Sequence, residues 1–401
     1  MFSHNYPPDH STDYRVEIID TETSLEDFVS RWVQFTNTSN NIHFYQDLER
    51  IQISQSTNQN TQGFRIIVLL KNNDIHCIAP LIREPQKFPV KFGSITLATI
   101  KCRRYKLPAG KLLFSEHADR LQCIRRILSL PRSTMEGINC LFIEEMLMSD
   151  AELLSRNLRG YRLKHMNHPP QSIWRLEIKG TFEHYLMRLN SKKRSEMRRR
   201  TRKLDSATDS WNIKCIDKAS DVAELLFAQA YVYDRCWKSS GLDQLRTGLG
   251  QRYLEEVASR GWLRSYILYC DNIPCAYSIN FQYRDIFYGQ EMAYDEDKSQ
   301  LGVGNVLVQE TIKDLHQNNS PKFMDFGFGD NPQKKLFCTQ SILASDTYLV
   351  RQFSLSCVLI EIQFLLSRLY HQFHQLAVLM NLDRKLKKKL SNLPLRKEPK
   401  D

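Results

Sequence analysis

Residues 286–305 read IFYGQEMAYDEDKSQLGVGN, and this stretch decides the fold of the second half of the chain. Its first nine residues are rich in aromatic and apolar side chains, which predicts a β-strand over 286–294. After a polar segment, Gly302 and Gly304 precede an apolar periodic stretch that predicts a helix from about Asn305 to His316. Glycines between a strand and a helix let backbone amides approach a phosphate, and the helix dipole favours the negative charge.

The segments around this stretch extend the pattern. Two further β-rich segments at 263–270 and 274–281 are joined to each other and to 286–294 by the tight turns Asp271-Asn272 and Arg284-Asp285. Such spacing predicts an antiparallel meander. The other elements expected in this half are helices at 182–204 and 220–239 and a strand at 322–328.

The first half of the chain has the same plan in outline. Strands are expected at 14–19, 64–70, 75–82, 94–100 and 138–143, helices at 24–35 and 119–128, and a loop at 53–61. The segment Asn73-Asp74-Ile75-His76-Cys77 is similar to Asp271-Asn272-Ile273-Pro274-Cys275, and each lies between two apolar strands. The shared context predicts two related domains in tandem.

We therefore expect an α/β (α+β) fold with two tandem domains, each a mixed, mainly antiparallel sheet flanked by helices. The expected boundaries are a flexible N-terminus at 1–13, domains at 14–170 and 171–345, and a helical, basic tail at 346–401.

In this tail, residues 353–380 are apolar but interrupted by charged and histidine side chains. This pattern predicts an amphipathic helix and argues against a membrane span. Five of the six residues 384–389 are Lys or Arg. Two readings of residues 353–389 stay open, a solvated tail and a contact with an anionic membrane surface.

The composition bounds the function. The 401 residues carry a formal net charge of +11, which favours an anionic partner such as coenzyme phosphates, tRNA, a glycan precursor or a membrane. The N-terminal residues do not resemble a secretory signal. The ten cysteines form no Cys-x-x-Cys pair and no zinc-type cluster. We expect a cytoplasmic protein with reduced thiols and without a metal.

Two segments together resemble a known family. The basic stretch 189–204, with Lys192, Lys193 and Arg194 near its start, is similar to the helix that opens the catalytic domain of CelD-like acetyltransferases. Residues 325–330, DFGFGD, followed by Lys334, resemble the Asp-x-Gly-x-Gly-Asp segment of these proteins. Over 173–337 the chain thus resembles the CelD/FemAB-like branch of the GNAT-type (acyl-CoA N-acyltransferase) superfamily.

This resemblance implies acyl transfer from acetyl-CoA or another acyl-CoA to an amine, such as an amino sugar in polysaccharide or cell-envelope synthesis. On the third strand, Glu291 is the candidate general base and Tyr294 the candidate donor to the leaving thiolate. The candidate cofactor-binding residues are Gln300, Gly302, Val303, Gly304 and Asn305. The candidate substrate-binding residues are Arg235, Trp237, Asp325, Asp330 and Lys334.

The sequence departs from the family at two positions, with Ser299 in place of the usual Gln or Arg and Gln333 in place of a Tyr. These departures leave two other readings open. One is a FemAB-like transferase that takes its acyl group from aminoacyl-tRNA. The basic helix suits this alternative, since it could contact tRNA phosphates. The other is a binding protein that kept the fold without catalysis. The absence of a nucleophile-elbow motif argues against a Ser-His-Asp or Cys-His hydrolase.

Overall fold

The computed structural model describes residues 13–38, 42–57, 63–84, 87–93, 95–101, 104–130, 140–158, 161, 163–236, 249–318 and 321–379. The expected flexible N-terminus, Trp237 and the basic run 384–389 therefore lie outside the described residues, apart from Asp13.

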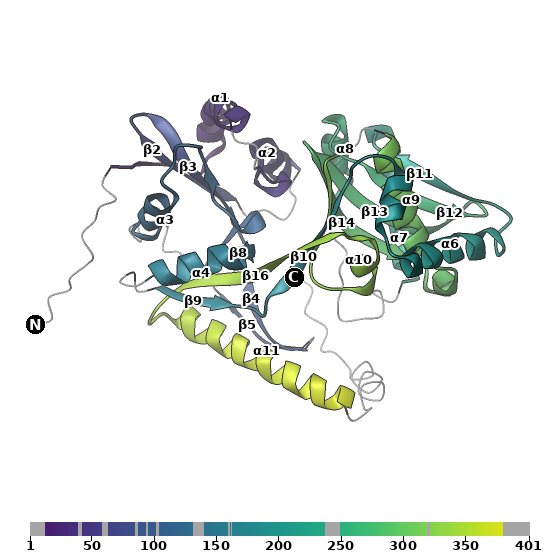
Figure 1. Cartoon of the computed structure of the whole chain (residues 1–401). Helices are drawn as coiled ribbons and strands as arrows, with labels where there is room; N and C mark the ends of the chain where they lie inside the picture. The colour runs from purple at the N-terminus through teal and green to yellow at the C-terminus, as the bar shows by residue number, and fades with distance from the viewer. Residues whose placement is uncertain are drawn as a thin grey trace, which may run out of the picture.

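Most of the strands form a single sheet that runs through both halves of the chain (Figure 1). The strands are β1 (Arg15–Ile19), β2 (Phe64–Lys71), β3 (Asp74–Arg83), β4 (Lys87–Phe92), β5 (Ile95–Lys101), β6 (Arg104–Leu107), β7 (Leu113–Phe114), β8 (Cys140–Leu147), β9 (Leu163–Asn167), β10 (Gln171–Glu177), β11 (Trp211–Ile216), β12 (Ser265–Cys270), β13 (Ile273–Tyr283), β14 (Ile286–Tyr294), β15 (Phe323–Phe328) and β16 (Gln340–Arg351). Their order in the sheet is β1-β2-β3-β6-β8-β16-β10-β15-β14-β13-β12-β11, with β7 beside β3 and β9 beside β16. Strands β4 and β5 form a separate hairpin.

Helices cover both faces of this sheet. The α-helices are α1 (Glu22–Thr38), α2 (Leu48–Ser56), α3 (Arg120–Leu128), α4 (Met148–Asn157), α5 (Phe182–Arg188), α6 (Ser191–Asp205), α7 (Val222–Tyr233), α8 (Gln251–Ser259), α9 (Val303–Gln317), α10 (Pro332–Phe337) and α11 (Leu355–Leu379). Short 3-10 helices are η1 (Phe44–Gln46), η2 (Pro108–Gly110), η3 (Ala219–Asp221) and η4 (Glu296–Leu301).

The two halves repeat one order of elements, and this confirms the tandem prediction. The first half runs β1, α1, α2, β2, β3, β6, α3 and β8, and the second runs β11, α7, α8, β12, β13, β14, α9 and β15. In each half the first strands are antiparallel, and the last pair, β6 with β8 and β14 with β15, is parallel. A parallel pair needs a crossover helix, which α3 and α9 supply.

The positions of the two hairpin turns show that the alignment of residues 73–77 with 271–275 is shifted by one residue. The turns are Asn72-Asn73 and Asp271-Asn272, and all four residues have positive φ, as tight hairpin turns require. Asp74 is therefore the counterpart of Ile273, since each is the first strand residue after its turn. The sequence comparison had paired Ile75 with Ile273. The similarity of the two hairpins is real, but the five-residue register was wrong.

The halves are joined by exchange of strands and by a shared core. Strand β10 lies between β15 and β16, and β16 continues into the first half beside β8. The expected domain boundary after residue 345 therefore falls inside β16. On one face of the sheet, α1, α2, α7 and α8 share a hydrophobic core in which the ring of Phe44 stacks on that of Phe281 at 4.7 Å. On the other face the halves have separate cores, under α3 and α4 and under α5, α6, α9 and α10.

Two predicted elements differ from the structure for local reasons. The helix expected over 182–204 is two helices, because Asn190 accepts a hydrogen bond from the Lys193 amide at 2.9 Å and caps α6. Residues 53–56 of the expected loop belong to α2, whose first turn is capped by Asp47. The apolar stretch 353–380 forms α11 as expected, and none of the helices among the described residues is long and apolar enough to cross a membrane.

Candidate functional site

A wedge opens in the sheet where β14 and β15 part. The two strands are paired only as far as Tyr288 and Asp325, although both continue beyond this point. On β13, the neighbouring residues Ile279 and Asn280 pair with Glu291 and Gly289 of β14. Gln290 is therefore an extra residue in β14, without a partner in this pairing. A bulge of this kind bends a strand and is common next to active sites. The remaining edge of β14 thus borders the wedge.

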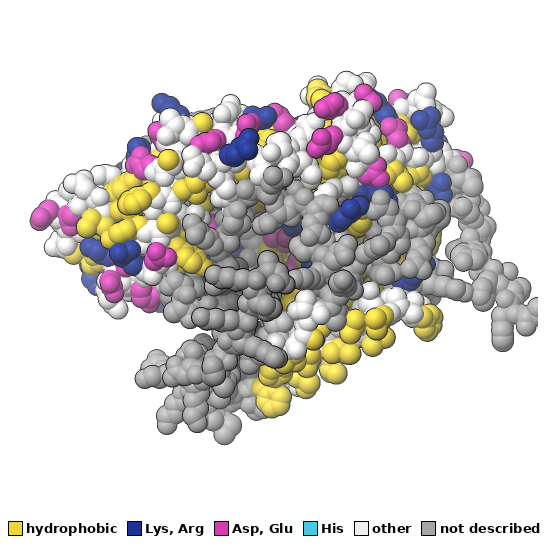
Figure 2. All heavy atoms as spheres, turned by 180° about the vertical axis from the view of Figure 1, so that it is seen from behind, with side chains coloured by type: hydrophobic (Ala, Val, Ile, Leu, Met, Phe, Trp, Pro, Cys, Tyr) yellow, Lys and Arg dark blue, Asp and Glu magenta, His cyan; other side chains and the backbone are white. Residues whose placement is uncertain are grey.

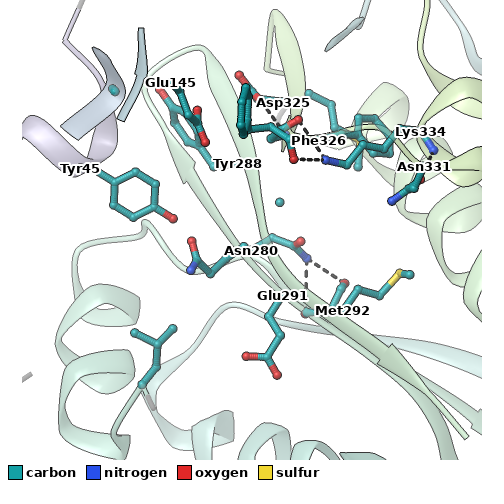
Figure 3. Close-up of a pocket in the computed structure, with 18 of the residues that line it drawn as sticks. Tyr45, Glu145, Asn280, Tyr288, Glu291, Met292, Asp325, Phe326, Asn331 and Lys334 are labelled. Atoms are coloured by element: carbon teal, nitrogen blue, oxygen red, sulfur yellow. Dashed lines mark hydrogen bonds between the residues drawn. The ribbon is translucent and has the colours of Figure 1, made fainter. Parts of the chain in front are cut away.

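The wedge belongs to a cavity of about 1210 Å³ between the two halves. Its walls in the second half come from β13, β14, β15, α9 and α10, and in the first half from η1, α2, β3, η2 and β8. Figure 3 shows side chains of both halves, such as Tyr45 and Glu291, around this space. A cavity of this size at the junction of two domains is a typical place for a ligand.

The start of α9 borders the cavity with an uncapped helix end. Its N-cap residue is Gly302, which has φ of 74° and supplies no side-chain hydrogen bond to the first turn. A helix N-terminus in this state leaves backbone N–H groups and the positive end of the dipole for an anion. Arg200 of the basic helix α6 lies alongside, since a Cβ at Gly302 would be 3.3 Å from its Cγ. Arg200 and Asn305 both line the cavity.

Gly304 is required by packing rather than by an open approach. A Cβ at this position would lie 2.8 Å from Cδ1 of Tyr294, which closes over the first turn of α9. On the other side, Nε2 of Gln333 donates to the Gly304 carbonyl oxygen at 3.2 Å and to Oδ1 of Asn305 at 3.3 Å. Gln333, at the position where the family usually has Tyr, thus ties α10 to the start of α9.

The corresponding helix of the first half has a closed N-terminus. The carboxylate of Asp119 accepts a hydrogen bond from the Gln122 amide at 3.0 Å and places negative charge where an anion would bind. After β6, the chain turns into η2, where Gly110 packs on the Glu145 carbonyl and Gln46 donates to the carbonyl oxygens of Pro108 and Lys111 at 3.0 and 2.7 Å. Among the described residues, the crossover helix of the first repeat is thus capped by a carboxylate, whereas that of the second repeat begins without a side-chain cap.

Glu291, the candidate base, lies buried on β14 and lines the cavity. Its Oε1 accepts a hydrogen bond from Nε2 of Gln229 at 3.1 Å and another from the Tyr277 hydroxyl. Tyr294 also lines the cavity but points to the α9 side of the sheet, as alternation along the strand requires. The two candidate catalytic residues thus border one cavity from opposite faces of β14.

The candidate substrate-binding residues of β15 and α10 have structural partners. Asp325 accepts from Nε of Arg175 at 2.9 Å and from the Gly327 amide at 2.7 Å. Nζ of Lys334 donates to the carbonyl oxygens of Gly327 and Phe328 at 3.0 and 2.7 Å (Figure 3). Burial lowers the pKa of Lys334, and the nearby Asp325 opposes this. Both side chains line the cavity while fixing the loop that ends β15.

Other candidates lie away from the cavity wall. Asp330 is exposed and accepts from Nε1 of Trp174 at 2.8 Å, so it does not pair with Lys334. Arg235 folds back along α7, where its guanidinium stacks on the Tyr231 ring at 3.7 Å. Gln300 is exposed on η4, and the Val303 side chain is buried in the core. The described residues contain no group of three or more His, Cys, Asp or Glu side chains that could hold a metal ion.

Glu145 of β8 is a site residue that the sequence analysis did not identify. It lines the cavity from the first half, and Figure 3 shows it beside Tyr288 and Asp325. Burial raises the pKa of Glu145 to about 8, with further contributions from Glu144, Asp325 and Asp346 and an opposing one from Lys334. Its φ of 56° is unusual for a residue other than glycine. Strained backbone and a shifted pKa in a cavity are typical of functional residues.

The strained conformation of Glu145 is fixed by its neighbours. Its amide donates to Oδ1 of Asp346 at 2.9 Å. Its carbonyl oxygen packs against Gly110, where a Cβ would come within 2.6 Å. The signal in the sequence was the pair Glu144-Glu145 directly after the predicted strand 138–143, because polar residues at the ends of strands collect at sites in α/β sheets.

Aromatic residues next to Glu145 present polar groups to the cavity. The Tyr288 hydroxyl is buried and makes no hydrogen bond of ordinary geometry to any described residue, although the Phe44 amide lies near it. The buried Tyr253 hydroxyl is in the same state. The His43 ring packs edge-on against Tyr288 at 4.4 Å and lines the cavity, and burial lowers its pKa to about 3. Unpaired buried hydroxyls are costly unless a ligand or water binds them.

Comparisons with known proteins agree with this architecture. Residues 191–335 match the model of the acetyltransferase (GNAT) domain. Among solved structures, FemX is similar with a TM-score of 0.55 at 10% identity, over 83% of this chain and 96% of that chain. A tandem GNAT protein from the clavulanic acid biosynthesis pathway is similar with a TM-score of 0.51 at 8% identity, over 84% and 98%. A conserved protein of unknown function from Bacteroides thetaiotaomicron has a TM-score of 0.53 at 14% identity, over 83% and 100%. At these identities the likeness concerns the fold, and no curated protein matches the sequence.

Proposed function

We propose that the protein transfers an acyl group from acyl-CoA, with acetyl-CoA as the first donor to test, to an amine, because residues 191–335 match the model of the acetyltransferase (GNAT) domain. The observation that supports this most is the uncapped N-terminus of α9, whose first-turn residue Asn305 lines the same cavity as the unpaired part of β14.

Each part of coenzyme A has a matching feature in the second half. The diphosphate would lie at the first turn of α9, where backbone N–H groups supply positive potential and Arg200, whose guanidinium pairs with Glu196 at 2.7 Å, lies alongside. The pantetheine arm has two amides and would run along the edge of β14 beyond Tyr288, with main-chain hydrogen bonds of the kind that an added strand makes. The thioester would then lie near the bulge at Gln290.

The acceptor would enter from the first half. Glu145 borders the cavity on that side, with Asp346 bonded to its amide and the unpaired Tyr288 hydroxyl next to it. A carboxylate and a free hydroxyl suit a protonated amine that also carries hydroxyl groups, which is the chemistry of an amino sugar. We therefore propose an amino sugar of a polysaccharide or cell-envelope precursor as the acceptor to test first.

In the proposed reaction, Glu145 holds the acceptor ammonium and Glu291 takes its proton, directly or through a water molecule. The neutral nitrogen attacks the thioester carbonyl, the C–N bond forms, the C–S bond breaks to release the coenzyme A thiolate, and the new amide nitrogen gives its second proton to water. Tyr294 would donate a proton to this thiolate and recover one from solvent. General acid–base catalysis of this kind contributes about 10²–10⁴-fold to the rate.

The test is thermal unfolding of the full chain with coenzyme A, 3′-dephospho-coenzyme A, pantetheine and acetyl-CoA. A ligand at a hundredfold excess over its Kd stabilises the folded state by about 2.7 kcal/mol. We expect acetyl-CoA and coenzyme A to raise the unfolding midpoint and pantetheine to raise it much less. If none of them changes the midpoint at millimolar concentration, the acyl-CoA proposal is wrong, and binding of aminoacyl-tRNA becomes the measurement to make.

Release of thiol from acetyl-CoA, with glucosamine as the amine, tests the second half of the proposal. A rate that depends on glucosamine concentration supports transfer to an amino sugar. If acetyl-CoA binds but the rate does not depend on glucosamine, the proposed donor site still stands and the proposal of an amino-sugar acceptor is wrong.

A further inference from the structure

Helix α11 exposes an apolar stripe from Leu355 to Phe373. Six side chains at spacings of three or four residues form it, which places them on one face of a helix. The exposed part of these residues ranges from 37% at Leu369 to 74% at Leu355. The members of this exposed stripe are Leu355, Val358, Ile362, Leu365, Leu369 and Phe373. Figure 2 shows hydrophobic side chains in a band along this edge of the molecule.

The opposite face of α11 is what attaches the helix to the protein. Cys357 and Ile360 are buried against β16, and the ring of Phe364 packs on that of His168 at 4.5 Å. Oε1 of Gln363 accepts a hydrogen bond from the Lys91 amide of β4 at 2.6 Å. Because one face already supplies the packing, the exposed stripe is not needed to hold the helix in place.

The charges near the stripe are arranged for an anionic surface. Within 355–370, the acidic residue is Glu361, and it pairs with Lys164, while Arg368 adds one positive charge. Soon after the end of α11, residues 384–389 carry Arg384, Lys385, Lys387, Lys388 and Lys389. An apolar helix face and a nearby basic cluster are the two signals that together give stable attachment to an anionic bilayer.

We propose that the exposed stripe of α11 lies in the headgroup region of an anionic membrane and that the basic run 384–389 strengthens this attachment. The helix would lie in the plane of the surface, since its opposite face is occupied by the protein. A second copy of the chain is the other occupant that would cover the stripe. The five Lys or Arg residues that each copy carries within 384–389 favour an anionic surface over a like-charged partner.

The experiment is flotation of the full chain with vesicles of phosphatidylglycerol and phosphatidylcholine in equal parts and with vesicles of phosphatidylcholine alone. We expect at least tenfold stronger partition onto the anionic vesicles at 0.1 M salt, and a marked loss at 0.5 M salt because the charge term is screened. Leu365→Glu should reduce partition at least tenfold. The triple variant Lys387→Glu, Lys388→Glu and Lys389→Glu should do the same and remove the salt dependence.

Phe227→Glu is the matched control, because Phe227 is an equally exposed apolar residue on α7 in the other half. It should float like the unchanged protein. All variants should keep the circular dichroism spectrum and the unfolding midpoint within a few degrees, since the side chains of Leu365 and Phe227 are 58% and 64% exposed and residues 387–389 are charged. The proposal is overturned if the unchanged protein stays unbound to anionic vesicles at low salt, or if Leu365→Glu and Phe227→Glu bind them equally. It is also overturned if the protein is a stable dimer in solution that Leu365→Glu converts to a monomer while vesicle binding is absent.

Discussion

The ring of Tyr294 lies so close to Gly304 that Cδ1 would be 2.8 Å from a Cβ at that position. Even the single methyl group of an alanine would therefore displace a residue that borders both the proposed donor site and the proposed thiolate. Gly304 links the end of β14 to the start of α9, and its role is to let these two elements meet.

The first prediction follows from this contact. Gly304→Ala should lower the free energy of unfolding by about 1–3 kcal/mol, the usual cost of overpacking. In a Tyr294→Ala background the same change should cost much less, because the ring that it would strike is gone. Denaturant unfolding of the two single variants and the double variant gives this coupling energy. Additive effects would contradict the contact.

The second prediction concerns the charge at the start of α9. Gly302→Asp would place at this helix the carboxylate that Asp119 places at α3 in the first half. We expect it to weaken coenzyme A binding by at least tenfold, because the new carboxylate repels the diphosphate and takes up the free N–H groups.

Gly302→Asn is the matched control for this change. Asn and Asp have similar shape and both tolerate the positive φ that Gly302 has, so the two variants differ mainly in charge. Titration calorimetry with coenzyme A should show weaker binding by Gly302→Asp than by Gly302→Asn. If the two variants bind coenzyme A with equal affinity, the proposal that the diphosphate binds at the N-terminus of α9 is wrong.

The third prediction concerns Glu145. Its folded-state pKa of about 8 is above the ordinary value for a glutamate, 4.5. At pH values between 4.5 and about 8, the folded state therefore keeps a proton on Glu145 that the unfolded state has lost. The contribution of this group to stability is therefore complete at low pH and is lost as pH rises toward 8, on the order of 1–3 kcal/mol. Glu145→Gln keeps the neutral form and should flatten this part of the pH dependence.

The affinity for the amine acceptor should increase with pH, whereas the stability contribution of Glu145 decreases with pH. Acceptor binding needs the carboxylate, so the KM for the amine should fall as pH rises through about 8. Glu145→Gln should raise this KM about 10–100-fold through loss of a charge-assisted hydrogen bond, with a small change in kcat. Glu152→Gln, at an exposed position on α4, is the control and should leave both constants and the pH profile unchanged. A Glu145→Gln variant with unchanged KM would contradict the acceptor role.

Particular elements show how far the sequence could lead. The meander β12–β14, the glycine turn and α9 were predictable because apolar alternation, tight turns and glycines act locally. The same local information suggested the tandem repeat, although with the hairpins one residue out of register. Helix α6 was expected to join α5, since the apolar stripe continues past Asn190 and only the cap interrupts it.

The candidate site was predictable only on its β14 and α9 side. Glu291, Tyr294 and Gly302 are close in sequence to the motif, whereas Glu145, Tyr288 and His43 become site residues through the packing of the first half on the second. That packing depends on contacts such as the one between Asp47 and the Tyr283 hydroxyl, at 2.6 Å across 236 residues of sequence. No local pattern encodes it. In the DFGFGD segment and the following helix, Asp325 is bonded to Arg175 and Lys334 to main-chain carbonyl oxygens, which the sequence pattern did not indicate.

The last prediction separates Glu291 from Glu145 in the reaction. Glu291→Gln keeps the shape of the side chain and an oxygen that can accept from Gln229 and Tyr277, so the protein should fold and bind coenzyme A normally. If Glu291 takes the proton of the amine, kcat should fall by about 10²-fold or more while the KM for the amine changes little. Tyr277→Phe is the companion variant, because it removes one hydrogen bond to Glu291 but leaves the carboxylate. It should lower kcat far less than Glu291→Gln does. If Glu291→Gln instead retains kcat and Glu145→Gln loses it, the proton goes to Glu145, and Glu291 only supports β14 against α7.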